Sequence, residues 1–213
     1  MQAARPFTYP GTDGDVLRLR ELLAMGLKAA AWTPPQTPAI LNLACGRADE
    51  TGILVELLAA PEAPLFLLGI DLRAAEIDEA NSRWQPACAP GQELEFRTGD
   101  ASRINHMNSL PPFDLIFIRH QNYWSTVGDW TRLLRNALTA LKDDGILVVT
   151  SYFDREHELA SACLLQLGAE RLADIPHPTS RPLNDAPDKS VDRRLAIFRQ
   201  GDGKRSTQPL ISR

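Results

Sequence analysis

The chain has 213 residues, 44% of them hydrophobic and 23% charged, which is enough for one globular domain with a sizeable core. Its formal net charge of -4 argues against a large nucleic-acid interface, because such an interface needs a basic face. No apolar run is long enough to span a membrane, and the N-terminus lacks the apolar segment of a signal peptide. We therefore expect a cytoplasmic protein with neither a membrane nor a nucleic-acid partner, and the oligomeric state stays open.

The cysteines and histidines show no spacing typical of a disulfide framework or a metal site. Cys45, Cys88 and Cys163 are widely separated, and their odd number favours reduced thiols. No two of the four histidines have metal-ligand spacing. We therefore predict that the chain binds no metal.

An extended arm and one amphipathic helix are expected at the start of the chain. Apolar side chains recur at helical spacing at Val16, Leu19, Leu22, Leu23 and Leu27, with Asp13 or Asp15 as the candidate helix cap. The proline-rich segment 32–38 cannot continue this helix. We assign residues 1–37 to an N-terminal arm and a helical cap.

Apolar strands and amphipathic helices alternate after this segment. Strands are expected at 40–44, 65–70, 94–97, 113–118, 145–151, 170–175 and 194–198. Helices are expected from Asp49, over 74–82, over 130–141 with Asp129 as its cap, and over 155–167. This alternation predicts an α/β fold with a mostly parallel sheet and helices on both faces. We assign residues 38–200 to this domain and 201–213 to a flexible tail.

The residues directly after each strand are the candidate site, because ligands of such sheets bind at the carboxyl ends of the strands. Ala44, Cys45 and Gly46 follow the first strand, and small residues there let the backbone approach a ligand. Asp71 and Leu72 follow the second strand, and the carboxylate of Asp71 can accept hydrogen bonds from two ribose hydroxyls.

The third strand is followed by Asp100 and Ala101, where a carboxylate can accept a hydrogen bond from an adenine amino group. Either Asp71 or Asp100 could instead cap the segment that follows it. Taken together, the three strand ends predict a nucleoside site.

The order and spacing of these segments resemble the class I S-adenosylmethionine-dependent methyltransferases. ILNLACGRA resembles their glycine-rich first motif, GIDL their acidic second motif and TGDAS their adenine-contacting third motif, whereas FDLIFIRH and LKDDGILVVT resemble the fourth and fifth strands. The resemblance covers about residues 38–199 and implies a Rossmann-like seven-stranded sheet with an antiparallel last strand. It also implies S-adenosylmethionine as the cofactor, with Asn42, Ala44, Cys45, Gly46, Asp71, Leu72, Asp100, Ala101 and Arg119 as its binding residues.

Two departures from the family pattern occur in the first motif. Of the usual three glycines only Gly46 is present, flanked by Ala44 and Ala48, and Asn42 replaces the usual first-strand acid. A nicotinamide-binding Rossmann domain would share the glycine turn and the acid after the second strand. Asp100 and the closing strand pair favour the methyltransferase-like fold.

A run of polar and aromatic residues follows the fourth strand at 119–124, where the resembled family faces the transferable methyl group. We predict His120 as the catalytic base, with Asn122 and Tyr123 as groups that orient the substrate. A backbone-bonded structural role is the alternative for His120, and ordinary packing is the alternative for Tyr123.

The predicted function is methyl transfer from S-adenosylmethionine to the oxygen or nitrogen of a small molecule. A small acceptor is favoured because the chain has no added recognition domain and no strongly basic run. Methylation of RNA or protein is one alternative. A noncatalytic nucleoside-binding protein, suggested by the reduced glycine motif, is the other.

Overall fold

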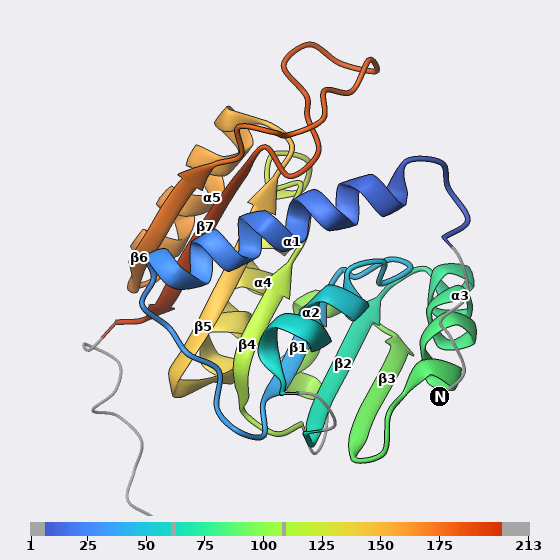
Figure 1. Ribbon diagram of the computed structural model, residues 1–213. Coiled ribbons are helices and arrows are strands. Elements are labelled where there is room, and N and C mark those ends of the chain that lie inside the picture. The colour runs from blue at the N-terminus through green and yellow to red at the C-terminus, as the bar shows by residue number, and fades with distance from the viewer. Residues whose placement is uncertain (1–6, 61–62, 108–109, 202–213) are drawn as a thin grey trace, which may run out of the picture.

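Seven strands form one sheet in the computed structural model, which describes residues 7–60, 63–107 and 110–201. The strands are β1 (Ala39–Leu43), β2 (Leu65–Asp71), β3 (Gln92–Thr98), β4 (Phe113–Ile118), β5 (Leu141–Ser151), β6 (Ala169–Pro176) and β7 (Arg194–Gln200). Their order is β3-β2-β1-β4-β5-β7-β6, and β7 alone runs antiparallel to its neighbours (Figure 1). The predicted fold class is confirmed.

Helices cover both faces of this sheet. They are α1 (Thr12–Ala29), α2 (Thr51–Leu58), α3 (Ala74–Trp84), α4 (Val127–Ala140) and α5 (Asp154–Gln166), with short 3-10 turns η1 (Gln85–Ala87) and η2 (Ala101–His106). One buried apolar cluster joins α1, α2 and α3 to the sheet, and a second joins η2, α4 and α5 to its other face. The N-terminal helix therefore belongs to a layer of the domain, where it lies beside α2 and against β6 and β7 (Figure 1).

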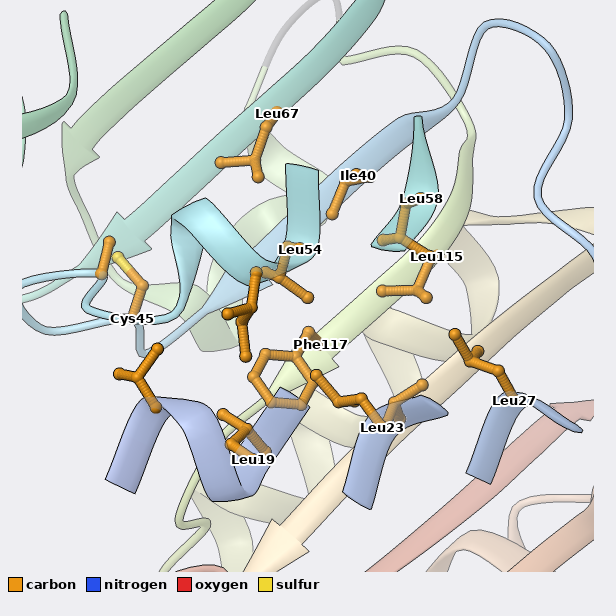
Figure 2. Close-up of a cluster of buried hydrophobic side chains, with 14 of the residues drawn as sticks. Leu19, Leu23, Leu27, Ile40, Cys45, Leu54, Leu58, Leu67, Leu115 and Phe117 are labelled. Atoms are coloured by element: carbon orange, nitrogen blue, oxygen red, sulfur yellow. The ribbon is translucent and has the colours of Figure 1, made fainter. Parts of the chain in front are cut away.

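The core beneath α1 and α2 fixes the positions of the central strands. Figure 2 shows leucines of both helices pointing toward β1, β2 and β4, and the side chains concerned are Leu19, Leu23, Leu27, Leu54, Leu58, Ile40, Leu67, Leu115 and Phe117. All of them are buried, and each contributes roughly 1.5–3 kcal/mol of transfer free energy. This packed core fixes the ends of the central strands and therefore the loops that follow them.

The helix starts differ from those predicted from capping residues. Asp129 lies in the first turn of α4, which begins at Val127 after Thr126, and there its charge favours the helix dipole without capping. Gly11 precedes α1 with φ +84°, and the carboxylate of Asp15 binds Arg181 and Arg18 instead of the helix end. Gly168, with φ +88°, follows the end of α5, which agrees with the helix predicted over 155–167.

Two further observations concern the extent of the domain. The tail predicted for 201–213 lies outside the described residues except for Gly201. No helix in the described part of the chain is long and apolar enough to cross a membrane.

Candidate functional site

The turn after β1 adopts a left-handed backbone at each of its three small residues. The φ angles are +53° at Ala44, +54° at Gly46 and +51° at Ala48. Glycine adopts this conformation freely, whereas each alanine is strained in it by about 1–2 kcal/mol. The chain thus keeps the turn of a glycine-rich motif although two of its residues are alanine.

Asp71, at the end of β2, is buried beside this turn. Its Oδ2 accepts a hydrogen bond of 2.8 Å from the Gly46 backbone nitrogen, and its Oδ1 accepts one of 2.9 Å from the Arg73 nitrogen. The Arg73 guanidinium also contacts the carboxylate at 3.0 Å, and its side chain is 61% exposed. Burial alone would raise the pKa of Asp71, but these hydrogen bonds outweigh it and lower the pKa, so the group is a ready anionic acceptor.

Asp100, after β3, uses one carboxylate oxygen to cap η2. Its Oδ1 accepts a 2.9 Å hydrogen bond from the Ser102 backbone nitrogen, and its Oδ2 lies 3.3 Å from Arg103 Nε. The bond to Ser102 lowers the pKa of Asp100. The carboxylate is 39% exposed, so it can cap and still meet a ligand.

Two adjoining hollows open at this edge of the sheet. The first has a volume of about 450 Å³ and the second about 660 Å³, and they share Ala44, Asp71, Arg73 and Trp130. Of the predicted cofactor residues, the first hollow is lined by Ala44, Cys45, Gly46, Asp71 and Arg119, and the second by Ala44, Asp71, Leu72, Asp100 and Ala101. An elongated nucleoside ligand can therefore lie across Asp71 with one end in each hollow.

Arg119 lies between two buried carboxylates at the floor of the first hollow. Its Nη2 is 2.7 Å from Asp192 Oδ2 and its Nη1 is 3.4 Å from Glu50 Oε2. Burial raises the pKa of Glu50. Burial would also raise the pKa of Asp192, but the charge of Arg119 and the contact with His120 hold that pKa far below its usual range.

His120 lines the first hollow, directly after β4. Its ring stacks on Tyr152 with centroids 3.8 Å apart, and its Nε2 lies 2.9 Å from Asp192 Oδ1. The backbone φ is +57° at His120 and +51° at Asp192, a conformation that is strained for both residues. Burial lowers the pKa of His120 although Asp192 acts in the opposite direction, so the imidazole is neutral near pH 7.

The other predicted residues are distributed differently. Asn122 is exposed and lines the first hollow with His120. Tyr123 does not line either hollow, since it is buried under α4 with its hydroxyl 3.1 Å from Thr131 Oγ1. Asn42 points below the turn, where its Nδ2 donates a 2.5 Å hydrogen bond to Glu50 Oε1. The structure therefore brings neither Tyr123 nor Asn42 to the cavity wall.

Sequence reasoning missed four residues of the site: Glu50, Trp130, Tyr152 and Asp192. Trp130 was expected only as the first residue of the helix predicted over 130–141, and in the structure it lines both hollows. Glu50 supplies the buried carboxylate that Asn42 lacks. The absence of an acid from the first strand could therefore have indicated that a nearby acidic residue takes its place. Asp192 had no local signal, because its partner His120 is 72 residues away.

Comparisons with known proteins agree with this geometry. Residues 40–145, close to half of the chain, match the family model described as a methyltransferase domain. No curated protein matches the chain in sequence.

Three solved structures illustrate the shared fold. An S-adenosylmethionine-dependent methyltransferase from Clostridium acetobutylicum ATCC 824 has a TM-score of 0.64 at 12% identity, covering 87% of this chain and 92% of that one. The N-methyltransferase NodS from Bradyrhizobium japonicum WM9 has a TM-score of 0.62 at 17% identity, covering 89% and 99%. A TehB-like SAM-dependent methyltransferase from Corynebacterium glutamicum ATCC 13032 has a TM-score of 0.55 at 21% identity, covering 89% and 97%.

The fold, the strained turn and the acid at the end of β2 define a nucleoside-binding α/β domain of the methyltransferase type. Residues 40–145 match a methyltransferase domain, and the chain has the fold of S-adenosylmethionine-dependent methyltransferases; it is a methyltransferase that uses this cofactor. The residues present fit it: a Cβ added to Gly46 would lie 2.6 Å from Glu76 Oε2, so only the flexible ends of Glu76 and Arg73 cover the turn.

Proposed function

We propose that the enzyme methylates an oxygen or nitrogen of a small-molecule acceptor, with His120 as the general base. The observation that carries this proposal is the imidazole of His120 at the wall of the first hollow, beside the turn of Ala44, Cys45 and Gly46, where burial lowers its pKa and favours the neutral form. A base in this position is needed when the acceptor must lose a proton as the methyl group is transferred.

The cofactor is proposed to lie across both hollows. The carboxylate of Asp71 accepts hydrogen bonds from the ribose hydroxyls once the side chain of Arg73 has moved aside. Asp100 and Leu72 face the adenine. Leu72 is 70% exposed, which makes it an apolar contact for a flat base. Glu50 lies at the other end, where a carboxylate can receive the ammonium group of the methionine part.

The bound cofactor supplies an activated methyl group on a sulfonium. The chain holds the acceptor in line with that methyl and removes its proton. For a hydroxyl acceptor, the oxygen lone pair forms the new C–O bond as the S–C bond breaks, and the hydroxyl proton passes to His120. Asn122, exposed at the same wall, can orient the acceptor through a hydrogen bond.

Charge supports a small acceptor over a nucleic acid. The net charge is -4, and the arginines of the first hollow face four carboxylates, those of Asp49, Glu50, Asp71 and Glu76. This surface would repel a phosphate backbone. Trp124, 42% exposed, and Phe153, whose ring centroid is 5.0 Å away, follow β4 and β5 and could give an organic acceptor an apolar contact.

The experiment that tests the proposal uses S-adenosylmethionine with a labelled methyl group and a cell extract split by size. We expect label in the small-molecule fraction, and we expect His120→Ala to lower it about 100- to 10,000-fold while cofactor affinity is kept. Label that enters RNA or protein would assign a macromolecular acceptor. Cofactor binding without turnover in any fraction would favour a noncatalytic protein.

A further inference from the structure

Asp192 makes an unusually complete set of buried contacts for a residue in a loop. It precedes β7, is 1% exposed, and accepts hydrogen bonds from Arg119 Nη2 at 2.7 Å and from Thr150 Oγ1 at 2.8 Å. Arg119 Nε lies 3.1 Å from Oδ1, and His120 Nε2 lies 2.9 Å from the same oxygen. These partners come from β5 and from the segment directly after β4, so the carboxylate is fixed from several sides.

His120 Nε2 lies near one hydrogen-bond acceptor and one hydrogen-bond donor. The carboxylate of Asp192 needs a proton on Nε2, whereas the Asp192 backbone nitrogen, 3.2 Å away, needs a lone pair there. A full negative charge at the shorter distance outweighs an amide dipole, because charge-assisted hydrogen bonds are about twice as strong as neutral ones. The proton of the neutral ring is therefore held on Nε2.

The other ring nitrogen is then the one that can react. Nδ1 has no hydrogen-bond partner among the described residues, and the His120 side chain, 17% exposed, lines the first hollow. With the proton on Nε2, the lone pair on Nδ1 faces the position of an acceptor.

We infer that Asp192 is the positioning residue of His120, holding the proton on Nε2 so that Nδ1 serves as the base. The inference rests on the proposed role of His120. Arg119 completes the arrangement, because its bidentate contact keeps Asp192 ionised and aligned. A buried chain of alternating charges thus runs from Glu50, beside the cofactor turn, to the base.

Nitrogen-15 NMR of the full-length wild-type protein tests the inference without cofactor, acceptor or turnover. His120→Ala identifies the resonances of His120 among the four histidines. We expect the Nε2-protonated tautomer in wild type. The Nδ1-protonated tautomer in wild type would overturn the inference even if His120→Ala abolished activity, so the two proposals can fail separately.

Asp192→Asn provides the second readout, with Thr150→Val as its matched control. The control removes the Thr150 hydroxyl, which donates to the same carboxylate and accepts from the His120 backbone nitrogen, but it leaves the charge of Asp192, and we expect it to keep the Nε2-protonated tautomer. Asp192→Asn can donate its amide to Nε2 and so place the proton on Nδ1, and we expect kcat to fall at least about tenfold with KM nearly unchanged. An unchanged tautomer in folded Asp192→Asn would overturn the inference. If this variant does not fold, the wild-type tautomer decides.

Discussion

Asn42 at the end of β1 donates a 2.5 Å hydrogen bond to Glu50, so the carboxylate at this edge of the sheet comes from the start of α2 and not from the strand. Glu50 is buried and also faces Arg119. The carboxylate that is usual in the first strand is therefore replaced by that of Glu50, which lies directly before α2 and still lines the first hollow.

Glu50→Gln is expected to weaken cofactor binding by about 1.5–3 kcal/mol, because a charge-assisted contact with the ammonium group would be lost. Glutamine keeps the size of the side chain and can still accept from Asn42. Isothermal titration with S-adenosylhomocysteine measures the effect. Glu56→Gln is the control, since Glu56 lies exposed on α2, the helix that Glu50 precedes. Equal affinities of the two variants would assign Glu50 to the fold alone.

Asp71→Ala is expected to weaken cofactor binding by about 1.5–3 kcal/mol, because two ribose hydroxyls would lose their charged hydrogen-bond acceptor. Asp78→Ala, on the exposed face of α3, should leave affinity unchanged. The comparison is made by titration at pH 7, with thermal unfolding as a check on the fold. If Asp71→Ala binds the cofactor as tightly as wild type, Asp71 only stabilises the Gly46 turn.

The pH dependence of turnover follows from the burial of His120. A general base works when it is neutral, and burial lowers the pKa of His120 below its usual value of 6.5. The ratio kcat/KM should therefore rise with pH through an inflection below 6.5 and stay level above it. An inflection above this value, or an acid limb that persists in His120→Ala, would assign the titration to another group.

The backbone strain of the turn after β1 can be measured through its effect on the free energy of unfolding. Ala44→Gly should raise the free energy of unfolding by about 0.5–1 kcal/mol, because glycine adopts the φ of +53° without strain. Ala137→Gly, in the interior of α4, should lower it by about 1 kcal/mol or more. Chemical denaturation of both variants gives the comparison. A loss of stability in both would mean that the turn carries no strain at Ala44.

The sequence predicts the strand ends well because parallel strands place their carboxyl ends at one edge. Asp71, Leu72 and Asp100 could be located from this rule alone, and the structure places all three at the second hollow. The place of the turn after β1 was also predictable from its small residues, although its left-handed backbone at Ala44 and Ala48 was not.

Positions that depend on long-range register could not be predicted. Asp192 lies just before β7, whose antiparallel pairing with β5 sets Arg194 opposite Ser151, and its carboxylate accepts a hydrogen bond from Thr150 of β5. Tyr123 was placed in the site because of its polar neighbours. In the structure the loop after β4 turns its hydroxyl toward Thr131, where burial of the ring outweighs exposure at the cavity.

A structure of the protein with bound S-adenosylhomocysteine tests the central claim most directly. We expect the adenine beside Asp100 and Leu72, the ribose on Asp71 with Arg73 displaced, and the sulfur in the first hollow facing Nδ1 of His120. The ligand would then leave room for an acceptor between its sulfur and that nitrogen. A ligand bound elsewhere, or a sulfur separated from His120 by intervening side chains, would contradict the account.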